Sequence, residues 1–266
     1  MAGYNILRHA SSPIRAYAPK PSSSDIHKLQ LEDTDWIKAQ LDDYQPSLIL
    51  YCHAVCDVDE CEKKPDWAEN LNVRHVERLL SVLPSDVRVM YVSSDHVFGG
   101  DGIYTEVDST CPISIYGRTR CQAEELISTH ANSLIIRHSL IIGPSHNQRS
   151  GHLDWMRHRA KTGLPMTIIH DESRSAIMAD HFAERALGLA QSGITGLRHI
   201  TSDACPSRPE LADHLSKGSF TFEYASRHDQ PYPHLGKVTL ESVCNDPLST
   251  PLPSPMHTTP GLALEG

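Results

Sequence analysis

Residues 89–126 decide the fold of this chain, and they read VMYVSSDHVFGGDGIYTEVDSTCPISIYGRTRCQAEEL. The segment begins with four apolar residues, which predict a buried strand that stops at two serines and Asp95. A glycine-containing loop follows, and Tyr116 then opens a polar helix that we expect to end near His130. The order places Ser94 at the end of a strand and a tyrosine at the start of the next helix.

Tyr116 and Arg120 lie four residues apart, so on a helix both side chains share one face. A cation beside a phenol favours the phenolate, which lowers a pKa that is otherwise about 10. Such a tyrosine exchanges a proton with a carbonyl or alcohol oxygen, and Ser94 is placed to hold the same oxygen by a hydrogen bond. The alternative is that Tyr116 is a buried aromatic residue and Arg120 a solvated helix charge.

Strands and helices alternate along the rest of the chain, which predicts a parallel sheet covered on both faces. The predicted strands are residues 47–52, 87–92, 133–142 and 198–201. The predicted helices are residues 33–44 (with Thr34 as N-cap), 70–83, 118–130, 152–163, 178–192 and 209–217. We expect a Rossmann-like α/β domain over residues 1–145, a smaller substrate-side lobe over 146–244 and a proline-rich tail over 245–266.

Composition narrows the class of protein. The 266 residues carry a net charge of −9 and no basic stripe, which argues against a nucleic-acid partner. No 18-residue apolar run and no signal-peptide core occur, so we expect a cytoplasmic protein without a membrane span. The seven cysteines are scattered, which is typical of reduced thiols. Cys52, His53, Cys56 and Cys61 lie close in sequence but lack the spacing of a zinc site, so we expect no metal.

Residues 93–126 resemble the extended short-chain dehydrogenase/reductases, and specifically the dTDP-4-dehydrorhamnose reductase family. That family reads S-T-D-x-V-F-x-G, then P-Y-x-E, then P-x-x-x-Y-G-x-x-K-x-x-x-E at matching spacing. Three further segments are similar to it, so the likeness runs from about residue 25 to residue 217. They are residues 29–54, residues 58–62 with Asn72 and Val73, and residues 171–183.

The resemblance implies a doubly wound Rossmann-like sheet that binds a nucleotide sugar and NAD(P)H. It implies catalytic roles for Ser94, Tyr116 and Arg120. The substrate residues that it implies are Asp95, His96, Val97, Phe98, Arg137 and Arg174, the last as a partner for a diphosphate. The cofactor residues that it implies are Gly3, His53, Ala54 and Arg120.

The chain departs from the family pattern on the cofactor side. No Gly-x-x-Gly-x-x-Gly occurs in the sequence, and Gly3 aligns with the last of those glycines. We therefore expect residues 4–9 to form a shortened helix and residues 14–18 the second strand of an N-terminally reduced sheet, whose missing central strand exposes two strand edges. Arg120 replaces the family lysine and cannot release a proton. Tyr51 and His53 stand where the family has small residues.

Two functions from different classes follow from these features. The first is an NAD(P)H-dependent reductase of a 4-keto-sugar nucleotide. The second is a non-catalytic binding subunit on the same fold, comparable to the beta subunit of methionine adenosyltransferase, acting as a homodimer or with a partner protein. A third possibility concerns the missing glycine loop: a strand and a glycine loop are encoded upstream of Met1. For the chain as given, we expect a dTDP- or UDP-sugar to bind more tightly than any dinucleotide.

Overall fold

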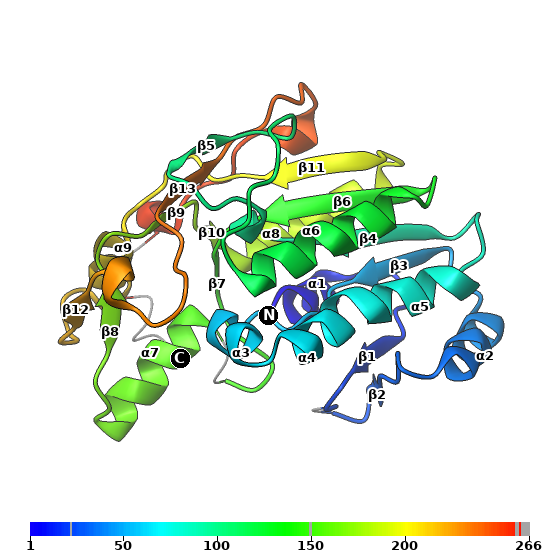
Figure 1. The fold of residues 1–266 in the computed structure, drawn as a ribbon, viewed down its shortest axis with the longest axis horizontal. Helices are drawn as coiled ribbons and strands as arrows, with labels where there is room; N and C mark the ends of the chain where they lie inside the picture. Colours follow the sequence, from blue (N-terminus) through cyan, green and yellow to red (C-terminus); the bar gives the residue numbers. More distant parts are fainter. Residues whose placement is uncertain (22, 149–150, 259–260, 262–266) are drawn as a thin grey trace.

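A computed structural model describes residues 1–21, 23–148, 151–258 and 261. Its centre is a four-stranded parallel sheet in the order β11-β6-β4-β3 (Figure 1). The strands are β3 (Leu48–Tyr51), β4 (Arg88–Val92), β6 (Ser133–His138) and β11 (Gly196–Ile200). Every residue of β4 is buried, because it has a paired strand on each edge and helices over each face. The predicted parallel α/β sheet is confirmed.

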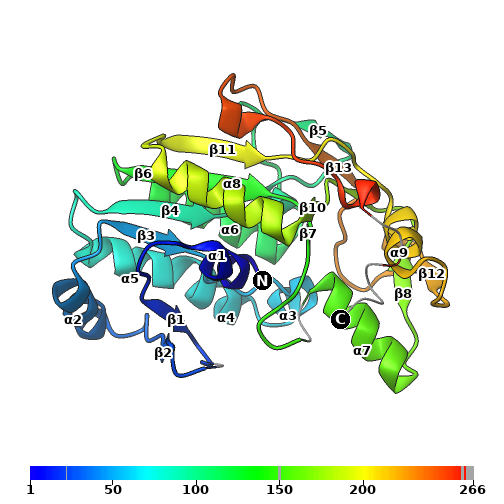
Figure 2. The same ribbon diagram turned by 180° about the vertical axis from the view of Figure 1, so that it is seen from behind.

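Helices cover both faces of this sheet. On one face lie α5 (His75–Val82) and α6 (Ile115–Ser128), and on the other lie α1 (Ala2–His9) and α8 (Ala179–Gln191), as Figures 1 and 2 show from opposite sides. Successive residues of β4 point to opposite faces, so Met90 packs in the core under α8 and Tyr91 in the core under α5 and α6. Helix α8, expected in the smaller lobe, therefore belongs to the main sheet.

The sheet is interrupted where the family pattern predicts a central strand. Strands β1 (Ala16–Ala18) and β2 (Ile26–Lys28) pair only with each other, and β3 pairs only with β4 among the described residues. Three of the four β3 residues and all of β1 are half-buried, as expected for strands with one unpaired edge. Helix α1 forms as predicted and packs against α8 beside this interruption.

Helix α2 (Thr34–Tyr44) flanks α5, but its N-cap differs from the prediction. The Asp33 carboxylate, not the Thr34 hydroxyl, accepts hydrogen bonds from the amides of Asp35 and Trp36. A carboxylate has the stronger charge interaction with the positive end of the helix, which explains the preference.

A smaller lobe lies beyond the carboxyl ends of the strands. Helices α7 (His152–Thr162) and α9 (Arg208–Ser216) pack there around a core of their own, which contains Met156 and Leu211. The lobe strands are β8 (Thr167–Ile169) paired with β12 (Glu223–Ala225), and β9 (Ser173–Arg174), β13 (Lys237–Leu240) and β5 (Gly102–Tyr104) in one sheet. Strands β7 (Ile141–Ile142) and β10 (Ile177–Met178) pair between the lobe and the main sheet.

The remaining helical segments lie in two regions, one after β3 and one in residues 245–258. After β3 come α3 (Val58–Lys63), α4 (Pro65–Glu69) and a π-helical turn (Asn70–Arg74) that leads into α5. Residues 245–258 include 3-10 turns at Pro247–Ser249 and Pro255–His257, and Leu252 forms a β-bridge with Ser202. Within the described ranges, no helix is both long and apolar enough to cross a membrane.

Candidate functional site

The predicted catalytic pair meets at the carboxyl end of β4. Tyr116 lies in the first turn of α6, whose N-cap Ser114 accepts the Gly117 amide at 3.0 Å. A β-carbon at Gly117 would lie 2.2 Å from the His96 carbonyl oxygen, so the close approach of α6 to this loop requires glycine. Ser94 lies two residues beyond the end of β4, and its hydroxyl lies near enough to the Tyr116 phenol to lower the phenol's pKa.

The net shift of the Tyr116 pKa is opposite to the sequence expectation. Only 6% of the side chain is exposed, and burial raises the pKa to about 12, although Arg120 acts in the opposite direction. At neutral pH Tyr116 is therefore a protonated phenol. It donates a proton or a hydrogen bond, and it does not act as a phenolate base.

Arg120 is a buried cation, not a solvated helix charge. Its guanidinium carbon lies 4.6 Å from the Tyr91 ring centroid and 5.9 Å from that of Tyr116, and its Nη2 donates to the Val92 carbonyl. Its Nε and Nη1 have no hydrogen-bond partner in the part of the chain that the structure describes. The arginine therefore holds a positive charge under the tyrosine and fastens α6 to the end of β4.

Asp95 and Arg174 join the main sheet to the lobe. Arg174 Nε donates to Asp95 Oδ2 at 2.9 Å, and Arg174 Nη1 donates to Glu172 Oε1 at 3.0 Å. Burial by itself raises the pKa of Asp95, but the guanidinium outweighs burial and leaves that pKa below its usual value. Both acids neutralise Arg174, so the residue predicted to bind a diphosphate already has two carboxylate partners.

His96 lies between Tyr116 and Arg174. Its ring meets the Tyr116 ring edge-on, with centroids 5.1 Å apart, and its Nε2 lies 3.4 Å from Arg174 Nη1. Burial and then Arg174 lower the pKa of His96 to about 4, so the ring is neutral at pH 7. Because a guanidinium only donates, Nε2 accepts and Nδ1 carries the proton.

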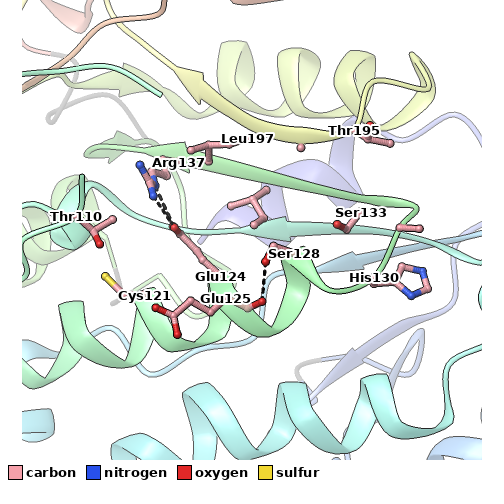
Figure 3. A pocket seen from close by; sticks show the side chains of 13 residues that line it. Thr110, Cys121, Glu124, Glu125, Ser128, His130, Ser133, Arg137, Thr195 and Leu197 are labelled. Carbon is pink, nitrogen blue, oxygen red and sulfur yellow. Dashed lines mark hydrogen bonds and ion pairs between the residues drawn. The ribbon is translucent and has the colours of Figure 1, made fainter. Parts of the chain in front are cut away.

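Three other predicted substrate residues are engaged in packing. Val97 and Phe98 are fully buried in a small core with Leu240, and the Arg137 guanidinium lies over the Phe98 ring. Arg137 also donates to both oxygens of Glu124, from Nε to Oε1 and from Nη2 to Oε2. Figure 3 shows this ion pair at one end of a 470 Å³ groove beside α6, which Ser94, Tyr116 and Arg120 do not line. The substrate roles of these residues remain predictions.

The predicted cofactor residues are closely packed. A β-carbon on Gly3 would lie 3.1 Å from the Cys52 β-carbon, so the first turn of α1 rests directly on the end of β3. The His53 ring stacks on His75 with centroids 5.5 Å apart, and Ala54 follows in the half-buried loop before α3. The described residues thus provide no glycine-rich turn with open amides for a pyrophosphate, and they do not fit a dinucleotide.

Asn72, noted in the sequence only as part of a matching segment, has a clear structural role. Its buried side chain accepts the Val55 amide at 2.8 Å and donates to the Val55 carbonyl and to Thr119 Oγ1. The π-helical turn brings it there, and it ties the loop after β3 to the helix of Tyr116. No group of three or more potential metal ligands occurs among the described residues.

Sequence reasoning did not identify Glu172, Arg208 or His152 as site residues. Glu172 binds Arg174, and Arg208 Nη2 lies 3.3 Å from His152 Nδ1. The only sequence signal was the position of Glu172 two residues before Arg174, inside a segment already singled out.

Comparison with known proteins identifies one family and several relatives. The family model described as RmlD substrate binding domain matches residues 2–251. A probable low-salt glycan biosynthesis reductase from Haloferax volcanii is 26% identical over 71% of this chain and 65% of its own length. The methionine adenosyltransferase 2 subunit beta of Danio rerio is 25% identical over 80% of this chain and 65% of its own length. The chain thus spans just under two thirds of these curated relatives.

Solved structures share the fold. The dTDP-4-dehydrorhamnose reductase of Bacillus anthracis, solved in complex with NADP, superimposes with a TM-score of 0.79 at 19% identity. The match covers 99% of this chain and 94% of that chain. At this identity the likeness concerns the Rossmann-like fold alone.

Proposed function

This chain belongs to the RmlD substrate binding domain family, and we propose that it binds a nucleotide sugar at the carboxyl ends of β4 and β6. The observation that carries the proposal is the placement of Ser94 and Tyr116 together at that edge, under a lobe fastened by Asp95 and Arg174. Open α/β sheets bind their ligands at this edge. The names of the relatives, a glycan biosynthesis reductase and a dTDP-4-dehydrorhamnose reductase, support a nucleotide sugar as the class of ligand.

The site supports one half of a keto-sugar reduction. Tyr116, protonated at neutral pH, would give its proton to the carbonyl oxygen of the sugar, while Ser94 holds that oxygen by a hydrogen bond. Arg120 then lies where it stabilises the phenolate left behind. The other half needs a hydride donor such as NAD(P)H. The described residues do not fit a dinucleotide, so without a hydride donor Tyr116 and Ser94 would only hydrogen-bond the carbonyl oxygen, and no proton would be transferred.

A second candidate is a binding subunit without catalysis. The beta subunit of methionine adenosyltransferase 2 matches 80% of this chain at 25% identity, which supports this candidate. The close packing of the predicted cofactor residues supports it as well. In that case the site at Ser94 and Tyr116 would bind a nucleotide sugar or no ligand, while another surface of the chain contacts an enzyme. Light scattering of the chain mixed with a purified methionine adenosyltransferase tests this candidate.

A thermal-shift screen tests the main proposal. Ligand that binds only the folded state raises the melting temperature by mass action, so UDP-glucose or dTDP-glucose at millimolar concentration should raise it by several degrees. Ser94→Ala should reduce this shift, and Ser128→Ala, on the exposed side of α6, should not. A panel of nucleotide sugars that leaves the melting temperature unchanged would exclude the proposal.

A further inference from the structure

Arg208 is a cation of the lobe that forms no ion pair with a carboxylate of the described residues, although the charge of Glu172 acts on it at longer range. It is the first residue of α9, and its amide donates to the Glu172 carbonyl at 2.9 Å, which places it beside β9. Its half-buried side chain forms no ion pair within 4.0 Å in the described residues. Glu172 is the nearest source of negative charge, but the Glu172 carboxylate already accepts a hydrogen bond from Arg174.

The position of Arg208 is unfavourable for stability. A cation in the first turn of a helix lies at the positive end of the helix dipole. The helix gains nothing from it as a cap, because Ser207 and Glu210 already form a complete capping box. Burial further penalises the charged guanidinium. A bound anion would offset both the repulsion from the helix dipole and the cost of burial.

His152 adds a hydrogen-bond donor beside Arg208. Because the Arg208 guanidinium can only donate to His152 Nδ1, the His152 proton is on Nε2. That Nε2 is buried, and no described residue accepts a hydrogen bond from it. The ring stacks on Trp155, with centroids 6.1 Å apart and planes 16° from parallel, so its orientation is fixed. Because the two ring nitrogens point away from each other, Nε2 and Arg208 are suited to different oxygens of one extended anion, such as a diphosphate.

A row of contacting residues connects this pair to the candidate active site. The Tyr116 ring contacts the His96 ring, and His96 Nε2 contacts Arg174. Arg174 forms an ion pair with Glu172, whose carbonyl accepts the Arg208 amide. In a nucleotide sugar the diphosphate is bonded directly to the sugar, so a sugar at Tyr116 directs its diphosphate toward an adjacent cation. Arg208 is the cation in this row that is not neutralised by an ion pair.

We propose that Arg208 and His152, and not Arg174, form an anion subsite that takes the diphosphate of the bound nucleotide sugar. The inference rests on the proposed function for the identity of its ligand, but not for the existence of the subsite. Arg208 would supply a two-pronged contact to phosphate oxygens and His152 Nε2 a single hydrogen bond. Arg174 instead holds the lobe in place through Asp95 and Glu172.

Titration calorimetry on the full chain tests the subsite with two probes, UDP-glucose and inorganic pyrophosphate. Arg208→Gln should weaken both by roughly 10- to 100-fold, since it removes charge-assisted hydrogen bonds. His152→Phe keeps the stacking on Trp155 and should weaken both by a smaller factor. Lys161→Gln removes an exposed positive charge from the same lobe and should change neither dissociation constant.

The two probes separate this proposal from the proposed function. Pyrophosphate binding that Arg208→Gln abolishes, without any UDP-glucose binding, supports the anion subsite and excludes the nucleotide sugar. UDP-glucose binding that is equal in wild type and Arg208→Gln overturns the subsite and leaves the function standing. If Arg208→Gln does not fold, Arg208→Lys, which keeps the charge but loses the fork geometry, should still weaken both probes; unchanged affinity there overturns the subsite. If the wild type binds neither UDP-glucose nor pyrophosphate, the subsite is also overturned.

Discussion

Asp95 and Arg174 form a two-pronged ion pair between segments 79 residues apart, with Arg174 Nε donating to Asp95 Oδ2 at 2.9 Å and Nη2 to Oδ1 at 2.5 Å. The Asp95 side chain is fully buried, and that of Arg174 is 8% exposed. The pair fixes the lobe over the strand end that carries Ser94. It links the stability of the fold to the shape of the candidate site.

Arg174→Ala should lower the free energy of unfolding by about 3–5 kcal/mol, because it leaves the Asp95 carboxylate buried and unpaired. Urea denaturation followed by circular dichroism measures this. The matched control is Arg227→Ala, which removes an ion pair to the exposed Asp101 and should cost no more than about 1 kcal/mol. Equal effects of the two substitutions would show that the Asp95 pair does not fasten the lobe.

The fold should lose stability in mild acid. Burial lowers the pKa of His53, of His96 and of His138 to about 4, from an ordinary value of 6.5. Below pH 6.5 the unfolded chain binds protons that the folded chain does not, so each histidine removes about 1.4 kcal/mol of stability per pH unit down to pH 4. Nothing is lost from this source above pH 6.5.

Urea midpoints at pH 7 and pH 5 measure this dependence. His53→Phe should reduce the loss of stability between pH 7 and pH 5 by the contribution of one histidine. His158→Phe, at an exposed position, should leave that loss unchanged. A midpoint that does not fall between pH 7 and pH 5 would contradict the neutral, buried histidines.

Tyr116→Phe should leave the fold intact, because the ring packing remains and only a phenol oxygen is lost. If the chain turns over a keto-sugar nucleotide, the loss of the proton donor should reduce the rate by about 10²–10⁴-fold. Ultraviolet titration gives a second readout: the wild type should have one more tyrosine ionising near pH 12 than the variant. Equal turnover in the two proteins would assign the tyrosine a structural role only.

The sequence predicted what depends on local pattern, and it missed what depends on burial and on distant contacts. The strand before Ser94 and the helix of Tyr116 follow from apolar runs and spacing, and both formed with ends within three residues of the predicted ones. The Tyr116 pKa was predicted to fall, but the degree of burial, which raises it, is a property of the folded chain. Arg174 was expected to bind a diphosphate, and its ion pair with Asp95 was missed because no sequence rule pairs residues that far apart.

On the cofactor side, too, the sequence predicted the residues present but not the contacts they make. The substitution of Arg120 for lysine was visible in the sequence, but its placement against Tyr91 was not. The sequence also indicated that His53 would crowd this side, whereas its stacking on His75 depends on how α5 lies against β3. Contacts of this kind form only after the elements have packed.

The most direct test is titration calorimetry of the 266-residue chain with UDP-glucose, dTDP-glucose and NADPH under one set of conditions. The described residues lack the amide-to-phosphate hydrogen bonds of a glycine-rich turn, each worth roughly 1.5–3 kcal/mol, so NADPH should bind with a Kd on the order of millimolar or weaker. At least one nucleotide sugar should bind more tightly than NADPH. Micromolar binding of NADPH, with no nucleotide sugar binding more tightly, would contradict the account.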